Sequence, residues 1–396
     1  MNDTSSTDDG RASRESGRRL SRRQVLATAS VLGTGSLAGC SGLFGGGDGG
    51  DGGGQDIGLS AFRGSGPLVS ARGDPGGTSI EEMPDLEGEL NFYLGGGEGG
   101  LYLDLIELFA DIYPDFSFNR TLDSSRSLAN RILQETEAGT SPADLFLSVD
   151  AGSLAQVAGQ GATIALSDDV VEGVPESLRT DQWVGIAGRA RAIPYNTNQI
   201  SRSEIPDTVR DFPQTAALAD SMGWAPTYSA FQSFVTAMRL IRGDDATRQW
   251  LNAMLDHGIE SFDNEFVVSN EVANGALTAG FANHYYALRV RNARQNAPIE
   301  LAFTSGDAGA LINVSGAEII QGTDNEELAQ NFIRHLLSSE AQEFFATRTF
   351  AYPTVAGIQP VGGLPTVDEL NPPDIELSEL ADTGPTLDLL NEVGLL

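Results

Sequence analysis

The folded part of the chain opens with three short apolar runs separated by two helical patterns. The apolar runs lie at 89–94, around 116–118 and at 142–150. Between them, leucine and isoleucine recur at helical spacing over 101–112, and a second helical pattern covers 126–138. This order of strand, helix, strand, helix, strand predicts a parallel sheet with right-handed crossovers, and therefore an α/β fold.

Two turns mark the edge of this sheet at which a ligand is expected. Parallel sheets bind ligands beyond the carboxyl ends of their strands, and the turns at 95–100 and 149–152 both follow strands. The first turn is rich in glycine, but it lacks the lysine of a phosphate-binding loop and a suitably placed acidic residue for a ribose hydroxyl. We therefore expect a ligand other than a nucleotide.

The length of the chain predicts two lobes. At 396 residues, the chain exceeds what one hydrophobic core usually holds. Strand-like and helical segments alternate again in the second half, so we expect two α/β lobes with a hinge and a cleft between them. The first lobe is predicted to comprise 89–191 with 316–366, and the second 192–315 with 367–396, so that the chain crosses between them more than once.

Residues 1–40 are predicted to be a targeting segment. The twin arginine Arg22-Arg23 precedes an apolar stretch that is too short and too rich in glycine to span a membrane, which is typical of a Tat export signal. Leu37-Ala38-Gly39-Cys40 resembles a lipobox, so we predict that Cys40, the only cysteine, is lipidated. The following stretch, 41–88, is rich in glycine and aspartate at its start and predicts a flexible tether between anchor and body.

The charge of the chain is strongly negative. Acidic residues number 55 against 24 basic ones, the net charge is −31, and every basic residue is arginine. An acidic secreted protein of ordinary kind would fit, but the complete absence of lysine favours adaptation to very high salt, where charge repulsion is screened. Nucleic acid is not an expected partner, because phosphate binding needs basic patches.

The adjacent tyrosines Tyr285 and Tyr286 are the most informative chemical feature. A strand would send neighbouring side chains to opposite faces, whereas a turn or a helix start lets both phenols approach one point. Phenolate is a hard oxygen donor that suits ferric iron. Taken alone, such a pair more often packs in a core or an interface. With three histidines and no cysteine after Cys40, a zinc or copper site is not expected.

Several motifs resemble one family in order along residues 89–396. They include Ser141-Pro142-Ala143-Asp144, Gly188-Arg189-Ala190-Arg191, Ala225-Pro226-Thr227, Asn283-His284-Tyr285-Tyr286 and Gly306-Asp307-Ala308-Gly309. The chain resembles the ferric-ion-binding receptors of bacterial-type ABC importers, which are transferrin-like proteins with the type 2 periplasmic-binding-protein fold.

The resemblance implies a metal site and an anion site. Tyr285 and Tyr286 would both ligate iron, and a synergistic anion, phosphate or carbonate, would sit on backbone amides where a helix begins. The matching positions are Thr227, Tyr228, Ser229 and Ala230, and a helix N-terminus suits an anion on physical grounds as well. Arg189 or Arg191 would supply compensating charge, although a salt bridge fits either arginine equally well.

The first lobe departs from the family pattern. The family's histidine in the first turn is replaced here by Gly97-Glu98, and its glutamate after the third strand by Val149, with Asp150 adjacent. Glu98 and Asp150 are therefore the candidate first-lobe ligands, with water and anion as the alternative. His284 precedes the tyrosines, and we expect it to support the turn rather than bind metal.

The resemblance predicts a monomeric binding protein rather than an enzyme. Its partners would be ferric iron or a ferric chelate, the importer's permease and ATPase, and the extracellular face of the membrane through the lipid anchor. A receptor of the same fold for an inorganic anion, a polyamine or a thiamine-like molecule is the alternative, since two aromatic rings can stack on an organic cation. The sequence contains no hydrolase elbow and no His-Glu-x-x-His run.

Overall fold

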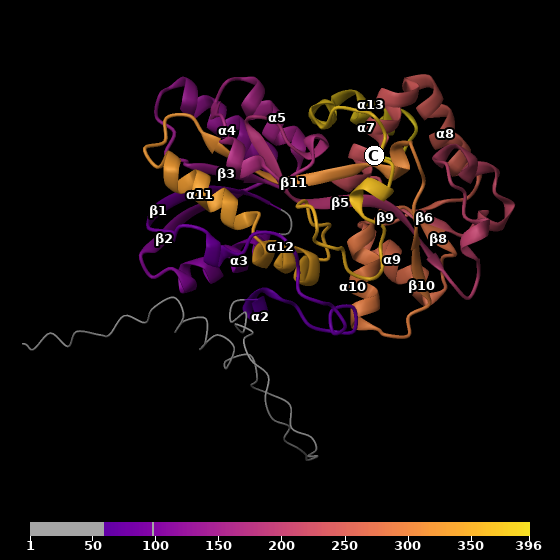
Figure 1. Cartoon of the computed structure of the whole chain (residues 1–396). Coiled ribbons are helices and arrows are strands. Elements are labelled where there is room, and N and C mark those ends of the chain that lie inside the picture. Colours follow the sequence, from indigo (N-terminus) through magenta and orange to yellow (C-terminus); the bar gives the residue numbers. More distant parts are fainter. Residues whose placement is uncertain (1–58, 97–98) are drawn as a thin grey trace, which may run out of the picture.

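Two α/β lobes make up most of the computed structural model, which describes residues 59–96 and 99–396 (Figure 1). The first lobe is built on β1 (Gly88–Gly95), β2 (Phe116–Asp123) and β3 (Leu145–Ser148), and β1 pairs in parallel with both neighbours. The connecting helices are α3 (Gly99–Ile112), α4 (Ser125–Glu137) and α5 (Ala151–Gly159). The predicted strand–helix alternation and parallel sheet are therefore confirmed.

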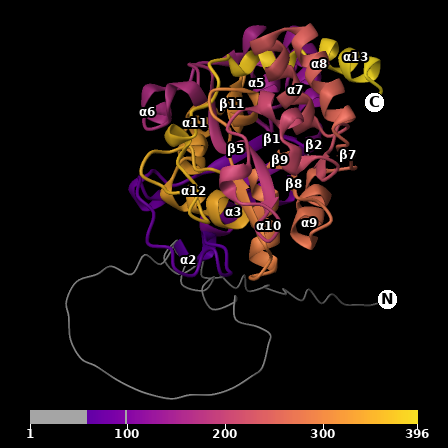
Figure 2. The same cartoon turned by 90° about the vertical axis from the view of Figure 1, so that its right-hand side faces the viewer.

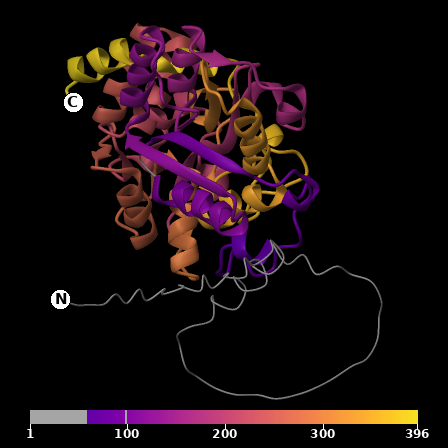
Figure 3. The same cartoon turned by 90° about the vertical axis from the view of Figure 1, so that its left-hand side faces the viewer.

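Aromatic and aliphatic side chains hold the helices of the first lobe to the sheet. Phe92 on β1 and Phe109 on α3 both contact Phe332, with ring centroids 4.8 and 5.8 Å apart. Phe332 belongs to α11, which covers the same sheet. The remaining elements of this lobe are β4 (Thr163–Ile164), α6 (Asp168–Val171), α11 (Glu326–Leu336), α12 (Ser339–Phe344) and a π-helical turn (Phe345–Thr349). Figure 3 views the lobe from the side of β1 and β2.

Two long antiparallel strands connect the lobes. The first half of β5 (Trp183–Asn196) pairs with β11 (Ile312–Ile320), and β11 in turn pairs with β3 of the first lobe. The second half of β5 pairs with the short strands of the second lobe instead. Each of these two strands is shared by both lobes, so the chain passes between the lobes along β5 and again along β11.

The second lobe packs its helices around a mixed sheet. Its strands are β6 (Met222–Trp224), β7 (Glu260–Ser261), β8 (Ala279–Gly280), β9 (Ala282–Asn283) and β10 (Ile299–Ala302). Its helices are α7 (Ser229–Arg242), α8 (Asp244–Asp256), α9 (Glu265–Asn274) and α10 (His284–Ala293), which Figure 2 shows from their own side. Phe234, Trp250 and Phe281 meet in its core, with ring centroids 5.6–5.8 Å apart.

The C-terminal segment touches both lobes. The short helix η9 (Leu377–Ala381) packs on α5 of the first lobe, and α13 (Gly384–Glu392) packs on α7 of the second. Gly152 permits the first contact, because a Cβ at this position would lie 2.9 Å from the backbone of Ala381. Thr386 fixes the second contact through a 2.7 Å hydrogen bond with Thr236. The segment therefore links α5 of the first lobe to α7 of the second (Figure 1).

The predicted tether over 41–88 needs correction. Residues 59–87 fold against the body: Phe62, Ile80 and Leu86 are buried, and Arg63 and Arg72 both pair with Glu343 on α12. Sequence composition was misleading here because a few buried anchors are sufficient to hold a polar segment in place. Only 41–58 remain available as a spacer, and they lie outside the described residues, as do the leader and Cys40.

Among the described residues, no helix combines the length and the apolar character needed to cross a bilayer.

Candidate functional site

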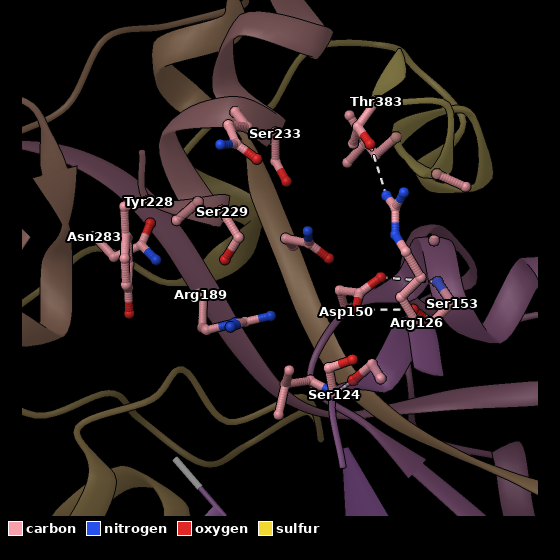
Figure 4. A pocket seen from close by; sticks show the side chains of 18 of the residues that line it. Ser124, Arg126, Asp150, Ser153, Arg189, Tyr228, Ser229, Ser233, Asn283 and Thr383 are labelled. Carbon is pink, nitrogen blue, oxygen red and sulfur yellow. Dashed lines mark hydrogen bonds between the residues drawn. The ribbon is translucent and has the colours of Figure 1, made fainter. Parts of the chain in front are cut away.

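A cavity of about 630 Å³ lies between the lobes. First-lobe residues on its wall include Ser124, Arg126, Asp150 and Ser153, and second-lobe or hinge residues include Arg189, Tyr228, Ser229, Asn283 and Tyr285. Figure 4 shows Arg189 extending from the hinge strand between the side of Asp150 and the side of Tyr228. Both lobes therefore contribute polar side chains to the wall.

Tyr285 and Tyr286 lie in the first turn of α10. Asn283 precedes this helix in an extended conformation. Its backbone N–H donates a 2.7 Å hydrogen bond to the buried carboxylate of Glu265, and this bond fixes the start of the helix. The ring centroids of the two tyrosines lie 4.3 Å apart, and each residue is about 5 % exposed to solvent. The predicted helix start thus brings the two phenols together, with Tyr285 on the cavity wall and Tyr286 next to it.

The hydroxyl of Tyr286 is also hydrogen-bonded to the hydroxyl of Tyr228. Burial, then the neighbouring Tyr285 and the hydrogen bond with Tyr228, raise the pKa of Tyr286 well above its usual value. The phenol is therefore protonated at neutral pH when no cation is near. A bound metal ion would have to displace this proton.

Tyr228 stands at the start of α7, where the anion site was predicted. It occupies the N-cap position in an extended conformation, and its side chain does not cap the helix. Ser229 and Ala230 follow in the first turn and line the cavity. The first backbone N–H groups of a helix have no partner within their own helix and point out of its N-terminal end. This end of α7 therefore presents hydrogen-bond donors to the cavity.

Two arginines place positive charge beside the tyrosines. The guanidinium of Arg289, one turn further along α10, lies 5.0 Å from the ring centre of Tyr285 and 5.5 Å from that of Tyr286. Burial alone lowers the pKa of Arg189, but Tyr285, Tyr102 and Asp150 outweigh it and raise the pKa, so Arg189 stays charged. Its Nε is buried and has no hydrogen-bond partner among the described residues.

Arg191, the other predicted anion-binding arginine, is engaged elsewhere. It is 3 % exposed and forms an ion pair with the carboxylate of Glu265, which is fully buried. The pair neutralises both groups within the wall of the site. Of the two arginines proposed from the sequence, Arg189 therefore has the freer guanidinium.

Of the two candidate ligands in the first lobe, only Asp150 lies within the described residues. Asp150 lines the cavity as the N-cap of α5, where its carboxylate accepts hydrogen bonds of 2.8 and 3.1 Å from the amide and hydroxyl of Ser153. Glu98 lies outside the described residues. In the described part of the chain, no group of three His, Cys, Asp or Glu side chains could hold a metal ion.

His284 is buried on the hinge side of the tyrosines. Its Nδ1 accepts from the backbone N–H of Ala190 at 3.2 Å, and its Nε2 donates to the carbonyl of Phe350 at 2.8 Å. Both ring nitrogens are thus used by backbone groups, as expected for a residue that supports the turn. Burial lowers the pKa of His284 to about 4, so the ring is neutral at physiological pH.

Three features of the site were missed in the sequence. Tyr228 was assigned for its backbone rather than its phenol, because a side chain's direction at a helix start depends on the packing of α10. Arg289 is three or four residues from the tyrosines, a helical spacing that does signal a shared face. Tyr102, in the first lobe, interacts electrostatically with Arg189 across the cleft, and only the folded hinge reveals this.

The model of the bacterial extracellular solute-binding protein family matches residues 140–372, which is more than half of the chain. The chain belongs to this family. Members of this solute-binding family are binding proteins rather than enzymes, and the expected two-lobe type 2 fold agrees with the structures to which the chain is similar.

Two curated relatives of this solute-binding protein are named for iron. It is 28 % identical to the major ferric iron-binding protein of Neisseria meningitidis over 276 residues, covering 68 % of this chain and 82 % of the relative. It is 29 % identical to iron uptake protein A2 of Synechocystis over 293 residues, with the same coverage.

Two solved structures of similar shape also come from iron proteins. Iron-bound HitA from Pseudomonas aeruginosa superposes with a TM-score of 0.67 at 25 % identity, covering 78 % of this chain and 99 % of HitA. A Trichodesmium protein in complex with iron and citrate gives 0.65 at 24 % identity, covering 78 % and 100 %, and this likeness concerns the fold alone.

Proposed function

We propose that this protein captures ferric iron outside the cell and delivers it to an ABC importer. The observation that carries the proposal is the pair Tyr285 and Tyr286. Their ring centroids lie 4.3 Å apart, and Tyr285 forms part of the wall of the interlobe cavity. Oxygen donors suit a hard trivalent cation. A relative named as a ferric iron-binding protein and the iron-bound structure of HitA favour the same cargo.

Binding proceeds by exchange of protons for metal. Each phenol gives up its proton to solvent as its oxygen binds iron, so affinity falls at low pH. Closure of the lobes about β5 and β11 brings the first-lobe carboxylates toward the metal. Asp150 or Glu98 is the proposed ligand on that side, and the charge of Arg189 lies in the cavity between the two lobes.

A synergistic anion, phosphate or carbonate, completes the proposed site. It sits at the start of α7 on the backbone of Thr227, Tyr228, Ser229 and Ala230. The free donors of a helix start favour an anion, and Arg189 adds a full positive charge nearby. Arg191 contributes indirectly, because its ion pair with Glu265 holds the wall of the site.

The cargo is handed over at the membrane. In this proposal the chain leaves the cell through the Tat route and is anchored by lipid on Cys40. It works as a monomer and passes iron to the importer's permease, which the ATPase drives. The acidic, lysine-free surface adapts the protein to an environment of high salt.

A receptor for an organic cation is disfavoured by the site itself. Stacking of a polyamine or thiamine-like molecule on Tyr285 and Tyr286 would need a free ring face. The guanidinium of Arg289 already lies over both rings, and Arg189 adds a second positive charge. The ring faces on which an organic cation would stack are therefore already covered by a side chain of the protein.

Titration with ferric citrate tests the iron proposal. We expect a visible phenolate-to-iron charge-transfer band in the wild type. Tyr285→Phe and Tyr286→Phe remove one oxygen each and keep the ring packing, so each should bind at least about 10-fold more weakly, since even outer ligands of a metal contribute that much. Tyr195→Phe, in β5 away from the cavity wall, is the control. A double variant, Tyr285→Phe with Tyr286→Phe, that binds as tightly as wild type would place the site elsewhere.

A further inference from the structure

The segment 59–70 runs beside the tyrosine pair without entering the cavity. Leu68 packs against the apolar cluster to which Tyr285 and Tyr286 belong, and none of the residues of this segment, all of them described, lies on the cavity wall. The same cluster includes Phe350, the residue that follows the π-helical turn. The segment thus contacts the surroundings of the proposed metal site and leaves the site itself open.

Hydrogen bonds and a close backbone approach hold the segment to the π-helical turn. Gly64 donates its backbone N–H to the hydroxyl of Thr347 at 2.8 Å, and a Cβ at Gly64 would lie 2.4 Å from the carbonyl oxygen of Thr347. Arg348 donates in return to the carbonyls of Ala61 and Phe62, at 2.7 and 3.0 Å. The segment and the turn are therefore bound from both sides, at a distance that leaves no room for a side chain on Gly64.

The turn in turn fixes the residue that precedes the tyrosines. Phe350 has a φ of 61°, in the left-handed region that a bulky residue rarely adopts. Such a conformation persists only where the surrounding structure imposes it. The carbonyl of Phe350 accepts a 2.8 Å hydrogen bond from Nε2 of His284. A turn that is held by the segment thus helps to hold the start of α10.

The segment also contacts α10 directly. Asn292, near the end of this helix, donates a 3.4 Å hydrogen bond from its side-chain amide to the carbonyl of Ser65. Gly66 has a φ of 115°, and a Cβ there would lie 2.3 Å from the amide oxygen of Asn292, so glycine permits both the turn and the approach. Ser65 contacts the end of α10 and Leu68 the cluster at its start, so the segment follows the helix along its length.

We propose that Leu68 is a positioning residue for ferric iron binding, which fixes the rings of Tyr285 and Tyr286 and is itself held in place by the segment 59–70. This inference rests on the proposed function of iron binding. Rings that are held before the metal arrives lose less conformational freedom on binding, so the affinity for iron is higher. Because such coupling is reciprocal, bound iron stabilises the contact of the segment with α10 by the same free energy.

The test compares Leu68→Ala with wild type in the full protein at molar salt. Truncation of Leu68 leaves a space beside the tyrosine rings, so we expect the amide hydrogens of α10 in the iron-free protein to exchange at least about 10-fold faster. In a titration with ferric citrate, we expect at least about 10-fold weaker binding. The charge-transfer band should also be weaker per bound iron at saturation, because the phenol oxygens no longer meet the metal at a fixed angle. Leu68→Met restores the volume and should restore all three values.

Ile80→Ala is the matched control. Ile80 lies further along the same N-terminal stretch, is fully buried, and belongs to the main core cluster rather than to the cluster of the tyrosines. Its truncation should lower the melting temperature at least as much as Leu68→Ala does, because Leu68 is only partly buried. The exchange of the α10 amides and the band per bound iron should stay as in wild type.

The possible outcomes separate this inference from the proposed function. A wild type with no charge-transfer band overturns iron ligation by tyrosine, whereas faster exchange of α10 in Leu68→Ala still supports the positioning role. If Leu68→Ala leaves both the exchange and the band per iron unchanged, the inference is overturned even if affinity falls. It is also overturned if Ile80→Ala changes both values as much, because a general loss of stability then accounts for the effect. Should Leu68→Ala not fold, Leu68→Val, a smaller truncation, takes its place in the same comparison.

Discussion

His284 shows how one buried side chain beside the tyrosine pair can make stability depend on pH. His284 directly precedes the two tyrosines in the sequence. Its ring is hydrogen-bonded to the backbone of Ala190 on β5 and to the backbone of Phe350, which follows the π-helical turn. In the folded state its pKa is about 4, against 6.5 for an unperturbed histidine. The folded protein therefore keeps the ring neutral at pH values at which the unfolded chain protonates it.

The sign of the resulting pH dependence follows directly. Because the folded-state pKa is lowered, the contribution of His284 to stability is complete above pH 6.5. It is lost as the pH falls from 6.5 toward 4, and the total loss is about 3 kcal/mol. We expect His284→Gln, which can keep both hydrogen bonds, to lose stability less steeply than wild type over this range. Denaturant unfolding at several pH values measures the difference. Parallel curves for the two proteins would contradict the assignment.

The sequence located the tyrosine pair on α10 better than it predicted the contacts around the pair. Adjacent tyrosines at a helix start can be read directly, because only local geometry is involved. The pairing of Arg191 with Glu265 joins β5 to α9 across 74 residues, so no local pattern could show that this arginine is occupied. The hydroxyl contact of Tyr228 with Tyr286 depends likewise on how two helices pack.

At the scale of elements, residues 59–87 form a belt over α12 that the sequence did not predict. The belt is anchored by Phe62, which contacts Phe109 with ring centroids 5.7 Å apart, and by two arginines at one carboxylate. Asn292 on α10 donates a 3.4 Å hydrogen bond to the carbonyl of Ser65, so the belt also reaches the second lobe (Figure 1). Its low apolar content concealed this role, because ion pairs contribute much of the contact.

Glu343 holds the belt to the body through two ion pairs. Its fully buried carboxylate accepts from Arg63 at 2.7 Å and from Arg72 at 2.7 and 3.0 Å. Glu343→Gln removes the buried counter-charge of two partly buried arginines and leaves Arg63 only the exposed Asp74 at 4.0 Å, so we expect a loss of about 3–5 kcal/mol of unfolding free energy. Arg131→Gln, which removes an exposed pair with Glu135 on α4, should cost less than about 1 kcal/mol. Equal losses from the two variants would show that the belt does not depend on Glu343.

At the scale of the whole molecule, alternation of strands and helices was enough to predict the architecture. A parallel β1–β2–β3 sheet requires crossover helices, and the long β5 and β11 extend the pattern into a second lobe. The sequence could not show that residues 377–392 would touch both lobes. This contact depends on the close approach of Gly152 to Ala381, which is a property of the folded surface.

The net charge of the whole chain affects the stability of the fold. Beyond residue 40 the chain carries 51 acidic residues against 18 arginines, so repulsion between carboxylates opposes the compact state. Salt screens this repulsion, since the Debye length falls from about 10 Å at 0.1 M to about 3 Å at 1 M. We expect the melting temperature to fall steadily as sodium chloride is diluted from molar concentrations. A variant with Glu137→Gln, Glu172→Gln and Asp374→Asn, all at exposed positions, should show a flatter dependence because fewer charges repel. If wild type melts at a higher temperature on dilution, or if the variant keeps the full salt dependence, carboxylate repulsion does not set the stability of this fold.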